Sequence, residues 1–211
     1  MKRALVMLGL LVIAMTAAAP AQTVSLGVQG ALGDYREVSS NLHFRGAGVG
    51  ATLWLRVHRL SAEGSFSQVN FDPRDASSGL KNFKAKQLDA RLGVDVAAGF
   101  SAEVGVMKRT IDPDLTAQEV GAGRIGVRYS KLIGPGASVA LRGNYLVGTK
   151  FTGAGSAGLA FELGLFVYVG PQNGRYRFTM DYGFQRIDRK VNSVSVPIEQ
   201  SLVKLGVAVG F

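Results

Sequence analysis

The sequence predicts an all-β protein, an antiparallel up-and-down transmembrane β-barrel with ten strands. Three observations predict it. Apolar residues recur at every second position over most of the chain, which indicates strands whose two faces meet different surroundings. Short and long polar links alternate between these strands. Glycine is abundant, at 28 residues, and charged residues make up only 18% of the chain, below the roughly 25% of typical soluble domains.

The first 21 residues have the layout of a secretory signal peptide. Two basic residues precede an apolar stretch over 4–19, and the Ala-Pro-Ala of 19–21 offers the small residues of a cleavage site. The apolar stretch is short for a membrane-spanning helix. We therefore expect cleavage after Ala21 and a single domain, the barrel, over residues 22–211. The chain has no cysteine, so an exported barrel must fold without disulfides.

Ten segments show the alternation. In the segment 88–99, for example, Leu88, Leu92 and Val94 share one face while Asp89 and Arg91 share the other. The segment 60–67 alternates least clearly, so eight strands remain an alternative if it and a neighbour do not span. The ten segments cover residues 23–30, 48–57, 60–67, 88–99, 100–106, 123–129, 138–147, 158–170, 175–184 and 201–211.

The links between the segments alternate in length. Short links lie near residues 58–59, 98–99, 134–136 and 170–174, and the last contains Asn173-Gly174, which favours a hairpin because both residues tolerate positive φ. Tight turns and both termini are therefore expected at one end of the barrel, and long exposed loops at the other. The longer polar links cover residues 33–41, 70–82, 110–116, 148–156 and 188–195.

The alternation of odd and even positions does not by itself determine whether the apolar face points outward into lipid or inward around a ligand, as in a secreted lipocalin-like barrel. A soluble barrel would carry dense Lys, Glu, Asp and Thr on its outer face, whereas the second face here is mostly Gly, Ala and Ser with sparse charges. A closed barrel satisfies its backbone polar groups internally, as a membrane requires. We therefore expect the apolar face, with its Tyr and Phe residues, to meet lipid.

The whole chain after residue 21 resembles bacterial outer-membrane β-barrel proteins. The signal peptide, the alternating segments and the asymmetric links carry the resemblance, together with a last strand that ends on an aromatic residue. In that family such a strand is the recognition signal for the barrel assembly machinery, so the resemblance implies this machinery as a partner. It also implies an outer-membrane location, surrounding outer-membrane lipid and periplasmic termini. The implied assembly signal is Val203, Leu205, Val207, Val209 and Phe211.

The charged residues of the second face are the candidate functional residues. By parity they point into the barrel, where unpaired charges are costly. We therefore expect acids and bases to pair across neighbouring strands, as between Arg142 and Glu162. The predicted network comprises Glu63, Asp89, Arg91, Asp95, Glu103, Arg124, Arg128, Arg142, Glu162, Arg177, Asp181 and Lys204.

No catalytic, cofactor or metal site is indicated. The chain has two histidines. Ser39 and Ser40 lie near His43, but their spacing matches no hydrolase motif. No cluster of His, Asp and Glu has the spacing of metal ligands. The Gly-rich segment 46–52 lacks the Lys and the following helix of a phosphate loop, so its glycines are expected to permit strand curvature. We expect no enzyme, no cofactor and no nucleic-acid partner.

We therefore expect a small structural or surface-interaction barrel with a salt-bridged lumen and exposed long loops. The alternative is a narrow pore that prefers small anions, because arginine is plentiful in the lumen. A hydrolase of outer-leaflet lipid, in which His43 would be essential, is a more distant third hypothesis. The basic residues of the segment 71–86 are candidates for contact with anionic lipid headgroups, and the long loops are candidates for contact with an extracellular partner.

Overall fold

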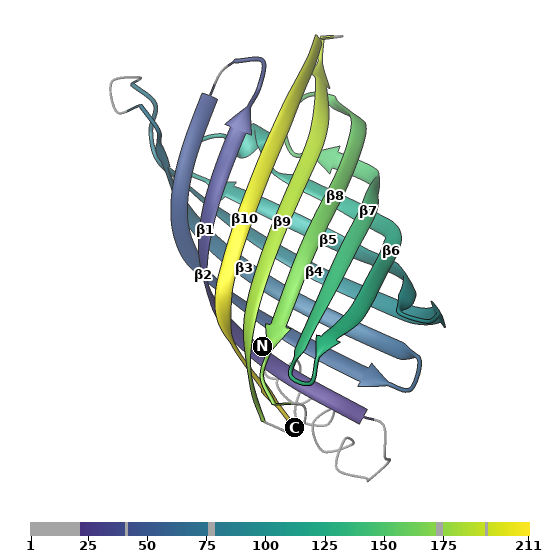
Figure 1. Ribbon diagram of the computed structural model, residues 1–211. Coiled ribbons are helices and arrows are strands. Elements are labelled where there is room, and N and C mark those ends of the chain that lie inside the picture. Colours follow the sequence, from purple (N-terminus) through teal and green to yellow (C-terminus); the bar gives the residue numbers. More distant parts are fainter. Residues whose placement is uncertain (1–21, 41, 76–78, 172–174, 193) are drawn as a thin grey trace, which may run out of the picture.

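The computed structural model describes residues 22–40, 42–75, 79–171, 175–192 and 194–211. The expected signal peptide and the Asn173-Gly174 turn therefore lie outside the described residues. Ten antiparallel strands form one closed barrel, in which β1 pairs with both β2 and β10 (Figure 1). The prediction of ten strands is confirmed, and the segment 60–67 is part of a full strand. The strands are β1 (Gln22–Glu37), β2 (Leu42–Val57), β3 (Leu60–Pro73), β4 (Phe83–Ala97), β5 (Phe100–Asp112), β6 (Val120–Gly134), β7 (Ala137–Phe151), β8 (Ser156–Val169), β9 (Tyr176–Val191) and β10 (Val194–Gly210).

Both ends of the described chain lie at the same end of the barrel, which we call the turn end (Figure 1). The strands are 13 to 17 residues long, because they continue into the segments that were expected to be loops. At the opposite end, the loop end, the links cover residues 38–41, 74–82, 113–119, 152–155 and 192–193, and all but 113–119 are shorter than expected. The expectation of long loops is therefore wrong for most of these links. The sequence turns polar there because the outer face of the sheet changes its surroundings, while the strands continue.

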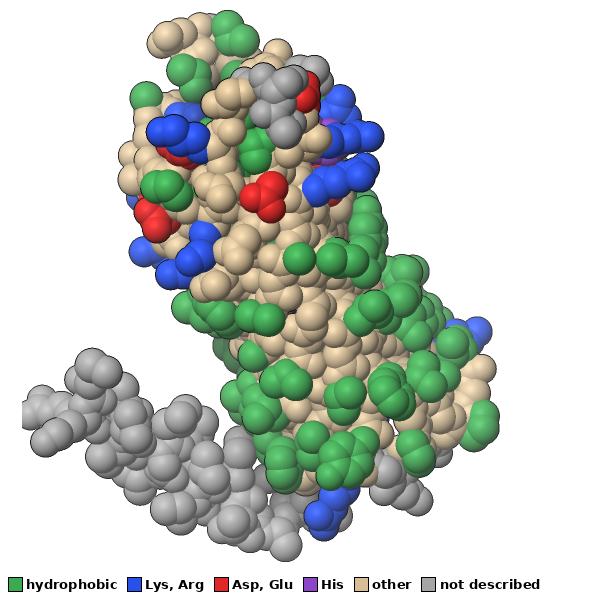
Figure 2. Space-filling view, turned by 90° about the vertical axis from the view of Figure 1, so that its left-hand side faces the viewer, with side chains coloured by type: hydrophobic (Ala, Val, Ile, Leu, Met, Phe, Trp, Pro, Cys, Tyr) green, Lys and Arg blue, Asp and Glu red, His purple; other side chains and the backbone are tan. Residues whose placement is uncertain are grey.

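The outer surface of the barrel carries an apolar belt on the half nearest the turn end (Figure 2). Its side chains are exposed, with 65% for Val28, 63% for Leu92 and 70% for Phe178. On β1 the belt runs from Val24 to Leu32, about 20 Å along the axis for a strand tilted by 40°, close to the roughly 25 Å apolar band of outer-membrane barrels. The lipocalin-like alternative is therefore wrong, because it requires the apolar face to point inward. No helix in the described ranges is long and apolar enough to span a membrane.

Above the belt, towards the loop end, the outward-facing positions become polar. On β1, for example, Leu32 is followed on the same face by Asp34 and Arg36. We call this ring of side chains the collar. It includes Asp34, Arg36, His43, Arg45, Gln68, Asn70, Asp72, Lys84, Lys86, Lys108, Thr110, Asp112, Lys150, Arg186, Asp188, Lys190, Glu199 and Ser201.

Glycines on the inner face of β2 allow β2 and β3 to approach closely. A Cβ atom at Gly46 would collide with the backbone of Asn70, and one at Gly48 would collide with that of Gln68. Larger residues at these two positions would force the strands apart. These contacts show close packing at two glycines of the segment 46–52, while the expected strand curvature stays a prediction.

The interior is filled in layers along the barrel axis. A vestibule opens at the turn end, charged side chains fill the middle, and apolar side chains fill the loop end. We call the last layer the aromatic plug. It is built around Tyr35, Phe44, Phe71, Phe83, Ile111 and Ile198, all buried.

Candidate functional site

Seven charged side chains meet in the middle of the lumen, and we call them the charge network. Three arginines project from β4, β6 and β7, and four carboxylates project from β3, β4, β5 and β8. All occupy inward positions of the alternation. All of them except Glu63 are buried, with exposed fractions from 2% for Arg124 to 9% for Arg91. The network comprises Glu63, Asp89, Arg91, Glu103, Arg124, Arg142 and Glu162.

Glu162 joins two of the arginines. Its Oε1 accepts hydrogen bonds from Arg91 Nη2 at 2.8 Å and from Asn144 Nδ2 at 3.1 Å, and its Oε2 accepts one from Arg124 Nη2 at 2.5 Å. Arg124 also donates to Asp89. Each arginine is thus shared between two carboxylates, which offsets the cost of burying its charge.

Arg142 joins the two remaining carboxylates. Its guanidinium lies 2.6 Å from Glu63 Oε2 and 2.7 Å from Glu103 Oε2, and it also stacks over the ring of Phe166 at 4.7 Å. Glu63 accepts a further bond from Arg91 Nη1 at 2.9 Å. The ion pairs therefore form one connected cluster, linked through Arg91 and Glu63.

The structure brings most of the predicted lumen charges together, but with different partners from those expected. Pairing across neighbouring strands was predicted, and Arg91 with Glu63 fits it. Arg142 and Glu162 lie on the neighbouring strands β7 and β8, yet Arg142 reaches across the lumen to β3 and β5 instead. The expected ion pair between Arg142 and Glu162 is not found among the described residues. The reason is the length of arginine, whose side chain crosses a narrow barrel more easily than it folds back beside its own strand.

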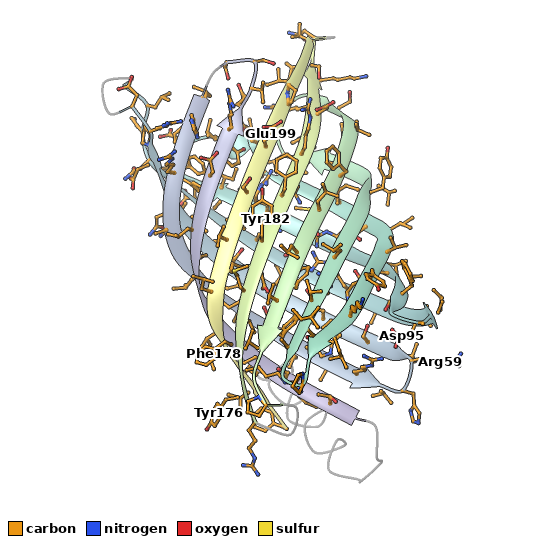
Figure 3. The ribbon with its side chains drawn as sticks, viewed as in Figure 1. Arg59, Asp95, Tyr176, Phe178, Tyr182 and Glu199 are labelled. Carbon is orange, nitrogen blue, oxygen red and sulfur yellow. The ribbon has the colours of Figure 1, made fainter. Side chains whose placement is uncertain are left out.

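The other predicted charges lie nearer the turn end. Asp95, labelled near that end in Figure 3, pairs with Arg56 at 2.5 Å. Asp181 lies 3.9 Å from Lys204. Arg128 approaches Glu103 only to 3.9 Å. Arg177 belongs to no ion pair among the described residues.

Sequence reasoning missed Arg109, which lies between the charge network and the aromatic plug. It is 1% exposed. Its guanidinium donates to Gln185 at 3.0 Å and to Gln200, and it lies 5.6 Å from the ring centroid of Tyr35. The predicted segment stopped at Val106, three residues before this position. Continued alternation along β5 would have placed Arg109 inside.

The aromatic plug closes the loop end. Phe83 lies at its centre, with ring centroids 4.9 Å from Phe44, 5.0 Å from Phe71 and 5.2 Å from Tyr35. The short 3₁₀ helix η2 (Thr116–Gln118) in the link between β5 and β6 covers it. The Tyr35 hydroxyl donates to buried Gln118 of that helix, so this link is fastened to the plug.

His43 lies in the collar, on the outer surface of the barrel. Its Nε2 is 2.7 Å from Asp34 Oδ2, and its Nδ1 is 3.2 Å from Arg74 Nη1. Ser39 donates to a backbone carbonyl at 3.0 Å, and Ser40 donates to a neighbouring carboxylate. Neither serine hydrogen-bonds to His43 among the described residues. The described residues also hold no group of three His, Asp or Glu side chains that could bind a metal ion.

No protein-family profile matches the sequence, and no curated protein matches it. Among solved structures, the barrel is similar to the COG4313 outer membrane channel from Pseudomonas putida F1, with a TM-score of 0.51 and 13% identity over 92% of this chain and 97% of that chain. It is also similar to the translocator domain of the autotransporter NalP from Neisseria meningitidis (TM-score 0.49, 12% identity, 99% and 95% coverage) and to the outer membrane protease OmpT from Escherichia coli (0.48, 9%, 90% and 96%). The similarity to the COG4313 channel supports the fold alone and carries no information about activity.

A closed antiparallel barrel with an apolar outer belt is the architecture of bacterial outer-membrane proteins. The chain has this fold and this belt, and it is an outer-membrane β-barrel with lipid around the belt. In such barrels the short turns face the periplasm. We therefore expect the turn end and both ends of the described chain to face the periplasm, and the loop end to face outward.

Proposed function

We propose that this protein is a closed, non-conducting and non-catalytic barrel that presents its collar at the outer face of the membrane. The observation that carries the proposal is the filled interior. Arg109 and Arg124 are 1% and 2% exposed, and Tyr35, Phe71 and Ile187 are 0% exposed. A cavity of about 80 Å³ lies within the charged layer, but side chains that are 0% exposed touch no solvent, which supports a lumen closed at the aromatic plug.

The alternative, a narrow anion-preferring pore, would require two separate layers to open. The charge network would have to separate buried ion pairs, which costs several kcal/mol for each partner removed. The aromatic plug would then also have to move, together with η2. Conductance in a planar bilayer distinguishes the two functions, because a folded but silent barrel supports the closed one and steady openings support the pore.

The collar is the surface through which a closed barrel would act, and its most basic part lies on β4 and β5. Lys108 pairs in register with Leu88 at the upper edge of the belt, and Lys86 pairs with Thr110 one step above. Both lysines are exposed, and neither belongs to an ion pair within the described residues. A lysine held at the edge of the hydrocarbon contributes about 1 kcal/mol of attraction to an anionic headgroup. This placement supports a contact with anionic lipid of the outer leaflet.

The test compares thermal unfolding in nanodiscs of phosphatidylcholine with and without phosphatidylglycerol. We expect the anionic lipid to raise the melting temperature of the wild-type protein, and the double variant Lys86→Glu/Lys108→Glu to lose this increase. Lys190→Glu is the matched control. It lies three outward positions above the belt residue Phe184, about 15 Å along the axis, beyond the reach of the headgroup charge. An increase that survives in the double variant would contradict the collar contact.

Absence of catalysis is part of the proposal. It is supported by the contacts of His43, whose ring nitrogens face Asp34 and Arg74 while both nearby serines are engaged elsewhere. The measurement is the release of fatty acid from outer-leaflet lipid by the protein and by His43→Ala. We expect equal background release from both. Hydrolysis that disappears in His43→Ala would establish the hydrolase instead.

A further inference from the structure

The vestibule at the turn end is a cavity that the closed-barrel function does not use. Its volume is about 500 Å³, within the roughly 300–1,000 Å³ of small-molecule sites. The first and last residues of several strands surround it, among them Ser25, Arg56, Ser138 and Arg177. A second cavity, of about 80 Å³, lies deeper among the charged side chains and shares Tyr168 and Asp181 with it. The vestibule is therefore a pocket that opens to the periplasm and ends at the charge network.

The carboxylates of the vestibule already have partners. Asp95 pairs with Arg56 at 2.5 Å and accepts a hydrogen bond from Ser101 at 2.7 Å. Asp181 accepts a bond from Gln29 at 2.7 Å and lies 3.9 Å from Lys204. A cationic ligand would have to displace one of these partners.

Two arginines of the vestibule are less well compensated. Arg177 is exposed at the rim and belongs to no ion pair among the described residues. Arg128 reaches Glu103 only at 3.9 Å, because that carboxylate is occupied by Arg142 at 2.7 Å. The vestibule therefore carries a surplus of positive charge in a site partly shielded from water, where an anion gains more than it would in bulk solvent.

Two aromatic side chains offer surface for the body of a ligand. The guanidinium of Arg128 lies 4.2 Å from the centroid of the Trp54 ring, so cation and indole form one platform. Tyr168 lines the same cavity. Neither the Trp54 N–H nor the Tyr168 hydroxyl makes a hydrogen bond within the described residues. Such polar groups on aromatic side chains usually find a hydrogen-bond partner when buried. Because neither group has one here, both can donate to a ligand.

We propose that the vestibule binds a small organic anion from the periplasm, a carboxylate or phosphate ester with a flat body. Arg128 and Arg177 contact the anionic oxygens, which suit the planar donors of guanidinium. Trp54 and Tyr168 contact the body. The site lies on the opposite face of the membrane from the collar, so this inference stands or fails separately from the proposed function.

Trp54 is the only tryptophan of the sequence, so its emission reports directly on the cavity. The barrel in neutral detergent micelles is titrated with benzoate, with phenyl phosphate and with benzyl alcohol as the uncharged probe. We expect a saturable change of Trp54 emission with at least one of the two anions and none with benzyl alcohol at equal concentration. The anion that binds more tightly identifies the class, carboxylate or phosphate ester.

Arg177→Gln tests the charge without disturbing the fold, because its side chain is exposed at the rim. Loss of one charge-assisted hydrogen bond weakens binding by about ten-fold or more. Arg128→Gln is the second variant, used where its heat-resistant gel mobility shows a folded barrel, and Lys190→Gln at the loop end is the matched control. Equal binding of benzyl alcohol, no saturable change with either anion, or equal affinity in Arg177→Gln and Lys190→Gln would each overturn the proposal.

Discussion

Replacing Glu162 by glutamine removes the charge that joins Arg91 and Arg124. Glu162 is 8% exposed, and each of its two oxygens faces a guanidinium. An amide of the same size keeps one oxygen acceptor but replaces the other by an NH₂ donor. In either orientation that donor faces the N–H groups of an arginine. The substitution therefore removes both the charge and the hydrogen bonds that one of the two oxygens accepts, while leaving the volume unchanged.

The expected loss in the free energy of unfolding depends on which carboxylate partners Arg91 and Arg124 retain. Removing one partner of a buried ion pair costs about 3–5 kcal/mol. Arg91 retains Glu63 at 2.9 Å and Arg124 retains Asp89, so neither becomes an isolated buried charge. We therefore expect the lower end, about 3 kcal/mol, which is roughly a hundred-fold change in the folding equilibrium.

The assay is reversible urea unfolding in phospholipid vesicles, followed by Trp54 emission. Glu199→Gln is the matched control, since Glu199 lies in the collar (Figure 3) and pairs with Arg186 at 3.1 Å with side chains 24% and 36% exposed. A partly exposed pair is worth less than about 1 kcal/mol. Equal losses in the two variants, or a loss below about 0.5 kcal/mol in Glu162→Gln, would refute the view that the charge network holds the lumen closed.

Two further substitutions test the belt and the plug with the same unfolding assay. Leu92→Arg places a charge in the middle of the belt and should cost about 2–4 kcal/mol, whereas Asn70→Arg in the collar should stay within about 0.5 kcal/mol of wild type; similar losses would mean that lipid does not surround the belt as described. Phe83→Ala should cost about 3–5 kcal/mol, because the ring at the centre of the plug leaves a cavity, while Phe178→Ala on the lipid-facing surface should cost less. A small loss in the free energy of unfolding for Phe83→Ala would show that the plug is loosely packed.

Much of the fold could be predicted from the sequence, because alternation reports directly on two unlike surroundings. All ten strands, including the weak 60–67 segment, follow from it. The strand ends could not be predicted in the same way. Beyond Leu32 or Phe66 the contrast between the faces reverses, because the outer face becomes polar while residues such as Tyr35 and Phe71 make the inner face apolar. An alternation followed with one fixed apolar face therefore ends there, although the backbone pairing continues. Polar strands above a membrane and polar loops have similar composition, which is why the links were overestimated.

The lumen charges could also be predicted, since inward parity alone selects them. Their partners could not. Contacts such as Arg142 with Glu63 join residues far apart in sequence across the lumen, and only the circumference of the closed barrel determines which side chains meet. The vestibule was missed for the same reason, because Trp54 and Arg128 lie on strands that are not neighbours. The role of the last strand in assembly stays a prediction.

Single-channel conductance tests the closed lumen most directly. The folded protein, verified by its heat-resistant gel mobility, is inserted into a planar bilayer and recorded in symmetric salt and in a salt gradient. The filled layers predict a silent bilayer at all moderate voltages. Steady openings with a preference for anions would show that the charge network and the aromatic plug separate together, and would contradict the closed barrel.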